Sequence, residues 1–194
     1  KTSLTARLVR FILGPRYEED PRGDRQRRVS RFVNQTQSCR VSTICQDLFY
    51  KNKAVDADGK ELPVDHTDSM NHDLVLQALH TELADDTVDC IIFEGFKAFH
   101  DTRLTDLMHL CIWLQASVDV ARKRRLTRNS CWTAAHFDDE IWAYHVLYEK
   151  DVLHRRHLKT RLHRISPEGP IRQKAYRVAA LIRASSARMA EHID

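Results

Sequence analysis

Apolar residues along this chain follow two different periods, and segments with each period alternate. Short continuous apolar runs, bounded by polar residues, are typical of strands buried on both faces of a sheet. Such runs predict strands at 39–47, 88–95, 109–116 and 163–169. Apolar residues at helical spacing predict helices over 2–13, 73–83, 119–128, 138–162 and 170–190. Strands that alternate with helices indicate an α/β protein with a parallel sheet covered on both faces.

The segment 15–38 does not follow either period. It contains two prolines, one glycine and a dense mixture of charges, and it begins with Pro15 of the Gly14-Pro15 pair that closes the first predicted helix. Such composition is typical of loops at the surface. We therefore expect 15–38 to be a charged surface insertion.

The composition is that of an ordinary globular protein and adds few constraints. The 194 residues are 42% hydrophobic and 30% charged, with a formal net charge of +4. This charge favours an anionic small molecule only weakly, and no basic stripe interleaved with aromatic residues indicates nucleic-acid binding. No apolar run is long enough to span a bilayer. The five cysteines never form C-x-x-C, so we expect reduced thiols and a cytoplasmic protein without membrane or nucleic-acid partners.

Two predicted strands end in acidic residues, Asp47 and Glu94. In open parallel sheets, ligands bind at the carboxyl ends of the strands. Each acid alone could equally cap the turn that follows it. The first residues, Lys1, Thr2 and Ser3, match the end of a phosphate-binding loop, G-x-x-x-x-G-K-[ST], although Lys-Thr also occurs by chance. We expect Lys1 to mark a truncation, with the glycines and first strand of such a loop missing.

The collinear series "KTSL", "ICQDLFYK", "VDHTDSMNHDLVLQAL", "CIIFEGFKAF", "ARKRRLTR" and "HFDDEIW" resembles the nicotinamide riboside kinases, in the uridine-kinase-like branch of the P-loop kinases. The resemblance spans nearly the whole chain apart from the charged insertion. It implies an α/β P-loop NTPase fold, a nucleoside-monophosphate-kinase-like three-layer sandwich whose first strand is missing from this chain. It also implies a single kinase domain over 1–194, with a lid at 122–138.

By the same resemblance the protein is a nucleoside kinase, a transferase that uses ATP and Mg²⁺ to phosphorylate the 5′-hydroxyl of a ribonucleoside. Nicotinamide riboside is the expected substrate, giving nicotinamide mononucleotide for NAD biosynthesis. A uridine/cytidine kinase and a non-catalytic, nucleotide-binding P-loop relative are the alternatives. Because the glycine loop is missing, we expect the chain as it stands to be impaired in catalysis. The sequence does not indicate an oligomeric state.

The resemblance also assigns roles to residues around the phosphates. Lys1, Thr2 and Ser3 would bind the phosphates of ATP, and Thr2 would ligate Mg²⁺. Asp47 would lie beside the 5′-hydroxyl and accept or orient its proton. Glu94 occupies the Walker-B-like position, where an acid holds a metal-bound water. Gly95 would let the backbone pass close to the nucleotide.

Substrate contacts are assigned in the same way. Asp65 matches the acid that binds the two ribose hydroxyls, with Val64 before it as a small wall for the base. Its alternative is an ordinary solvated loop acid. Tyr50 falls where an aromatic ring lies against the base, although a core tyrosine is almost as good an interpretation.

The basic run "RKRR" has three interpretations: a solvated helix face, a nuclear-localisation or nucleic-acid patch, or the lid of a nucleoside kinase. We favour the lid. Arg124 and Arg128, one helical turn apart, would share a face and close over the transferred phosphoryl group. Arg124 would thereby act in catalysis, and Arg125 matches the arginine of the family that contacts the substrate.

Overall fold

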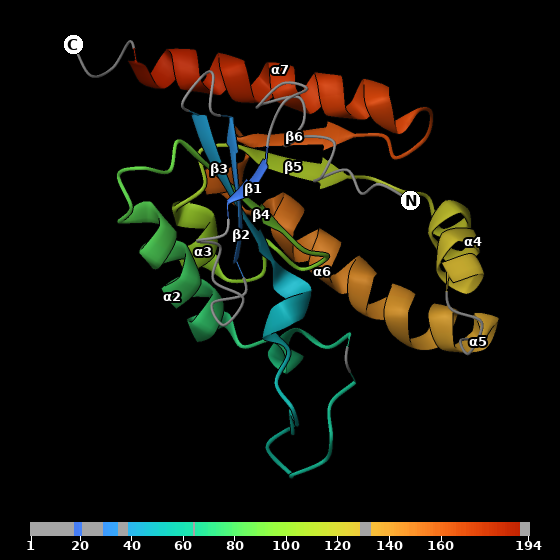
Figure 1. Cartoon of the computed structure of the whole chain (residues 1–194). Coiled ribbons are helices and arrows are strands. Elements are labelled where there is room, and N and C mark those ends of the chain that lie inside the picture. Colours follow the sequence, from blue (N-terminus) through green and yellow to red (C-terminus); the bar gives the residue numbers. More distant parts are fainter. Residues whose placement is uncertain (1–17, 21–28, 35–38, 64, 129–132, 191–194) are drawn as a thin grey trace.

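The computed structural model describes residues 18–20, 29–34, 39–63, 65–128 and 133–190. The predicted helix over 2–13, the phosphate-binding residues Lys1, Thr2 and Ser3, and Val64 lie outside these residues, so the expectations for them stay predictions. Elements below carry the labels of Figure 1.

Within the described residues, six strands form two sheets, whose arrangement is seen in Figure 1. The larger sheet has the order β1-β2-β3-β4, in which β3 and β4 are parallel and the other neighbours are antiparallel. Strands β5 and β6 pair in parallel as a second sheet. The bounds are β1 Glu18–Asp20, β2 Val29–Asn34, β3 Cys39–Cys45, β4 Cys90–Glu94, β5 Cys111–Leu114 and β6 Leu162–Ile165. All four predicted strands are present, and β3 to β6 correspond to them in chain order.

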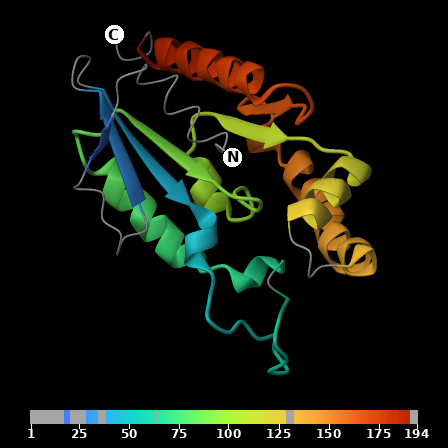
Figure 2. The ribbon, with the colours of Figure 1, turned by 45° about the vertical axis from the view of Figure 1, so that its right-hand side comes forward.

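The two sheets share one layer that helices cover on both sides (Figures 1 and 2). In β4, Ile91 and Phe93 pack on the core beneath α2, whereas Ile92 packs with residues of α7. In β5, Trp113 packs against α6, and Ile112 faces the α7 cluster. Alternate residues of a strand point to opposite faces, so α7 covers one face while α2 and α6 cover the other. The predicted three-layer α/β fold is confirmed.

The helices connect these strands and position the loops at their ends. The α-helices are α2 His72–Leu83, α3 Thr102–Asp106, α4 Val118–Arg128, α5 Ala134–His136, α6 Ala143–His154 and α7 Ile171–Ala190. Short 3₁₀ turns are η1 Gln46–Phe49, η2 Thr67–Ser69 and η4 Arg156–Leu158, and η3, Phe137–Trp142, is a π-helix. In the described ranges, no helix has both the length and the apolar character needed to cross a membrane.

The charged segment 15–38 contributes two strands, β1 and β2, instead of forming only a surface loop. Val29 of β2 is buried in the core. On the same side of the strand, Arg31 donates to both carboxylate oxygens of Glu82 in α2, at 2.9 and 2.8 Å, and lies 2.8 Å from a carboxylate oxygen of Asp85. Glu82 is buried, and a buried carboxylate needs such a partner. The arginine therefore joins the sheet to α2.

The long helix predicted over 138–162 is wrong at its end, because α6 stops at His154 and strand β6 begins at Leu162. Arg155 leaves the helical conformation, with ψ of 112°. Its guanidinium donates to the carbonyl oxygens of Phe99 at 2.6 Å and His100 at 2.9 Å. These tertiary hydrogen bonds end a helix whose local sequence contains no glycine or proline to stop it.

Candidate active site

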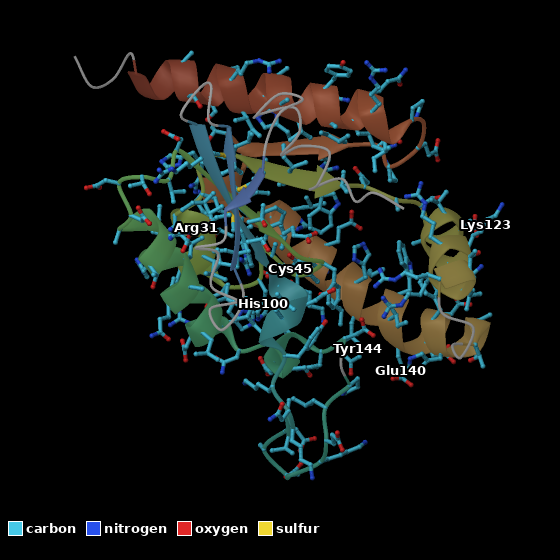
Figure 3. The ribbon with its side chains drawn as sticks, in the orientation of Figure 1. Arg31, Cys45, His100, Lys123, Glu140 and Tyr144 are labelled. Atoms are coloured by element: carbon cyan, nitrogen blue, oxygen red, sulfur yellow. The ribbon has the colours of Figure 1, made fainter. Side chains whose placement is uncertain are left out.

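Two acids meet at the carboxyl edge of β3 and β4. The strands are parallel, and Cys45 of β3 is in register with Glu94 of β4. Asp47 follows in the first turn of η1, and both carboxylates are exposed. Cys45 ends β3 at this edge (Figure 3). Burial raises the pKa of its thiol to about 11, and the negative charges of Glu94 and Asp47 add to this effect. The thiol therefore stays protonated at neutral pH.

A third acid, Asp65, lies across from α4. Asp65 is 6% exposed, and its carboxylate is 3.6 Å from the Arg125 guanidinium of α4. Burial raises the pKa of the Tyr50 phenol, the carboxylates of Asp47 and Asp65 raise it further, and Arg125 lowers it. Because all three charged groups affect the pKa of its phenol, Tyr50 lies near Asp47, Asp65 and Arg125. We call Asp47, Tyr50, Asp65 and Arg125 the acid–arginine cluster.

Backbone hydrogen bonds hold the segment that carries Asp65 against the end of η1. Tyr50 forms an antiparallel bridge with Met70. The backbone N–H of Lys51 donates to the Ser69 carbonyl, and that of Asn71 donates to the Phe49 carbonyl, both at 2.9 Å. Backbone pairing of this kind fixes the two segments in one register. The cluster is therefore positioned by the fold itself, not only by side-chain contacts.

The three arginines of α4 that were predicted to form a lid contact different neighbours in this structure. Arg125 faces Asp65, but Arg124 donates to the carbonyl oxygen of Pro167 at 2.8 Å. Arg128 is exposed at the end of α4. Side chains adjacent in a helix point about 100° apart, so Arg124 and Arg125 serve different neighbours. The structure brings only Arg125 to the cluster.

Sequence reasoning missed Arg122, which fixes α4 to the π-helix η3. Its guanidinium donates twice to one oxygen of Asp138, at 2.8 and 2.7 Å. Single π-helical turns within α-helices often occur at functional sites. The charge run "RKRR" did not distinguish Arg122 from its neighbours, because only the partner across the fold identifies its role.

Gly95 is required by a close contact within the protein. A Cβ at this position would lie 2.2 Å from Oε1 and 2.4 Å from Cβ of Gln46. Gln46 is fully buried, and its Oε1 accepts a hydrogen bond of 3.0 Å from the backbone N–H of Lys97. The approach of a nucleotide to Gly95 stays a prediction. Because Gly95 has no side chain, the loop after β4 can pack against the turn that carries Asp47.

Replacing Gly95 by alanine should displace Gln46 and break its hydrogen bond to Lys97. We expect the free energy of unfolding to fall by about 1–3 kcal/mol, as for other overpacked sites, measured by urea unfolding. In a Gln46→Gly background the same substitution should cost much less, because the whole clashing side chain, its Cβ included, is gone. An equal cost in both backgrounds would contradict this explanation.

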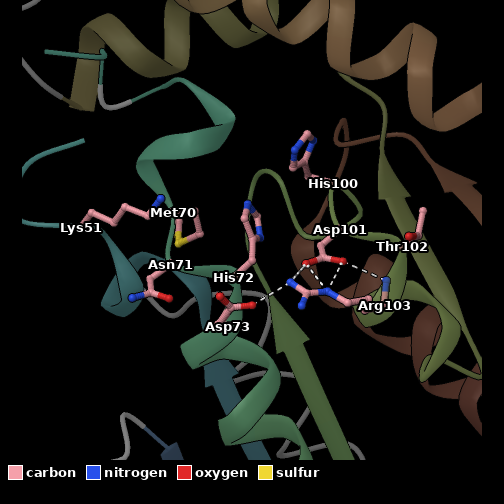
Figure 4. Close-up of a pocket in the computed structure, with 9 residues that line it drawn as sticks. All are labelled: Lys51, Met70, Asn71, His72, Asp73, His100, Asp101, Thr102 and Arg103. Carbon is pink, nitrogen blue, oxygen red and sulfur yellow. Dashed lines mark hydrogen bonds and ion pairs between the residues drawn. The ribbon is translucent and has the colours of Figure 1, made fainter. Parts of the chain in front are cut away.

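A cavity of about 460 Å³ lies beside the cluster and does not include any of its residues (Figure 4). Its lining residues are Lys51, Met70, Asn71, His72, Asp73, His100, Asp101, Thr102 and Arg103. Arg103 binds Asp101 and Asp73 across its floor, and the rings of His72 and His100 have centroids 5.2 Å apart. Because Lys51 follows Tyr50 directly, the cavity adjoins the site from the side of α2.

The acids at the sheet edge have the chemistry that Mg²⁺ requires. Among the described residues, no three His, Cys, Asp or Glu side chains are grouped so that they could hold a metal ion by themselves. Mg²⁺ in phosphoryl-transfer sites is usually bound by one or two carboxylates together with water and substrate phosphates. Asp47 and Glu94, both exposed at one edge, fit that donor set.

Comparison with known proteins identifies similar sequences. Residues 27–133 match the phosphoribulokinase / uridine kinase family, which is more than half of the chain. Uridine-cytidine kinase A of Dictyostelium discoideum is 30% identical over 111 residues. The match covers 46% of this chain and 22% of that protein, so the chain spans less than a quarter of the length of this relative.

Proposed function

This chain belongs to the phosphoribulokinase / uridine kinase family, and we propose that it transfers the γ-phosphoryl group of ATP to the 5′-hydroxyl of a ribonucleoside. The observation that supports this most is the acid–arginine cluster. It combines an exposed carboxylate at the sheet edge with a buried carboxylate and a guanidinium. Phosphoryl transfer needs positioning and neutralisation of charge more than covalent chemistry by the protein, and these groups supply both.

Each residue has a defined task in this proposal. Asp65 accepts hydrogen bonds from two vicinal ribose hydroxyls and thereby orients the nucleoside. Asp47 accepts the proton of the 5′-hydroxyl while the 5′-oxygen of the nucleoside bonds to the γ-phosphorus. At the same time the bond between the γ-phosphorus and the bridging β-phosphate oxygen breaks, and ADP leaves. Arg125 neutralises negative charge on the substrate side. Glu94, together with the Thr2 hydroxyl, would hold Mg²⁺, partly through water, and the ion would supply charge neutralisation on the phosphates when it is bound.

Two different observations favour two candidate nucleosides. The "QDLFY" and "EGFKAF" segments resemble the nicotinamide riboside kinases, and this favours nicotinamide riboside, with nicotinamide mononucleotide as the product. The similarity to a protein named uridine-cytidine kinase A favours a pyrimidine nucleoside as the second candidate. The lid assignment for 122–138 and the phosphate-binding roles of Lys1, Thr2, Ser3, Arg124 and Arg128 belong to the same proposal.

The test is release of ADP by the full-length protein, measured by a coupled assay with Mg-ATP. Nicotinamide riboside, nicotinic acid riboside, uridine and cytidine are compared at equal concentrations, with ATP alone as the blank. Nicotinamide riboside should give a higher kcat/KM than uridine and cytidine. A preference for uridine or cytidine would replace the proposed substrate. Nucleotide binding without turnover of any nucleoside would leave the non-catalytic P-loop alternative.

A further inference from the structure

Lys97 carries a buried amino group that has no hydrogen-bond partner among the described residues. The residue is 3% exposed, and its Nζ makes no hydrogen bond there. Its recorded neighbours are two aromatic rings, with Nζ 5.0 Å from the ring centroid of Phe96 and 5.8 Å from that of Tyr144. Aromatic faces attract a cation, but they compensate only part of the hydration that an ammonium group loses.

The charge of Lys97 is only partly balanced by carboxylates. Burial lowers the pKa of its ammonium group to about 8, and the negative charges of Asp65 and Asp68 act in the opposite direction. The group is therefore mostly protonated at neutral pH. Buried charges in proteins are usually paired, so an ammonium group without a hydrogen-bonded anion is a place where a ligand could supply one.

Lys97 lies close to Asp65, the carboxylate that we propose binds the ribose. Its backbone is fixed by Gln46, and its side chain approaches Tyr144 of α6 near Asp65. The ring of Phe96 is 43% exposed. Exposed aromatic faces beside a ribose-binding carboxylate offer a surface on which a flat heterocycle can stack. The flexible stem of a lysine lets its head turn toward a group on that heterocycle.

We propose that Lys97 binds an anionic substituent on the base, so that the site prefers a nucleoside whose base carries a carboxylate over its neutral amide counterpart. This inference rests on the proposed function, because it takes Asp65 as the ribose-binding residue. The carboxylate would accept a charge-assisted hydrogen bond from Nζ. It would also remove the imbalance of charge that the ligand-free protein contains.

The test compares nicotinic acid riboside with nicotinamide riboside in wild-type protein and in Lys97→Met. We expect the substitution to lower kcat/KM for the acid by about 10- to 100-fold, the worth of one hydrogen bond to a charged group. The amide should change by less than about threefold. Lys150→Met, which removes an exposed ammonium group from α6, is the matched control and should leave both values unchanged.

Stability and binding complete the test. Methionine fills a similar volume without a buried charge, so Tm of Lys97→Met should equal or exceed that of the wild type. Equal losses for both ribosides would overturn the inference and make Lys97 a packing residue. If the wild type phosphorylates neither riboside, the proposed substrate is wrong, and calorimetric titration with both ribosides decides about Lys97 separately. Equal affinity of wild type and variant for the acid would then overturn it.

Discussion

Asp47→Asn should lower kcat about 10²- to 10⁴-fold, the range that a general base contributes, while the Kd for ATP changes less than about threefold. Asparagine has the same shape as aspartate but cannot accept the proton of the 5′-hydroxyl at neutral pH. The side chain is exposed in η1, so its exchange should not disturb packing. The measurements are steady-state ADP release and equilibrium titration with ATP.

Asp106→Asn is the control for this experiment, because Asp106 is an exposed acid at the end of α3 that we place in no catalytic role. It should retain wild-type kcat. If Asp47→Asn loses affinity for ATP as strongly as it loses turnover, Asp47 acts on the nucleotide or in the structure and not as the base.

Asp65→Asn should lower kcat/KM for the nucleoside about 100-fold or more, mainly through KM. The substitution weakens hydrogen bonds to two ribose hydroxyls, each worth about 1.5–3 kcal/mol when the acceptor is charged. ATP affinity should remain near the wild-type value, since Asp65 lies on the side of the site that faces Arg125. Initial rates at varied nucleoside and saturating ATP measure the effect.

Two further variants separate ribose binding from the contact with Arg125. Asp68→Asn changes an exposed acid three positions away in the same loop and should have little effect. In a double-mutant cycle with Arg125→Met, a purely structural Asp65–Arg125 pair would give a coupling energy in unfolding, while Asp65→Asn alone would leave KM for the nucleoside unchanged. That result would contradict the role given to Asp65.

The layered fold could be predicted from the sequence because each strand is local and strongly apolar. Strand β4 lies within the continuous run 88–95, and the periodicity of α2 and α7 is equally clear. Strand β2 was missed, since Arg31 is stabilised by Glu82 and Asp85, about fifty positions away along the chain. The end of α6 was missed for the same reason, because the partners of Arg155 lie in another loop.

The residues of the candidate site likewise divide into some that the sequence indicates and some that it does not. Asp47 and Glu94 could be predicted from strand ends alone, and the resemblance was needed to single out Asp65 from the other acids of its loop. Gln46 and Lys97 did not stand out, because their burial arises only when the loop after β4 meets η1. For Gln46, the available signal was its position between an apolar strand and a candidate catalytic acid.

Two tryptophan side chains beside His145 give the chain an optical reporter of its own movements. Trp113 in β5 and Trp142 in the π-helix both stack near the ring of His145, with centroids 5.9 and 4.8 Å from it. One indole belongs to the sheet layer, and the other lies next to the segment that Arg122 ties to α4. Any displacement of the π-helix relative to the sheet changes the surroundings of an indole, so intrinsic fluorescence can follow such a displacement without an attached dye.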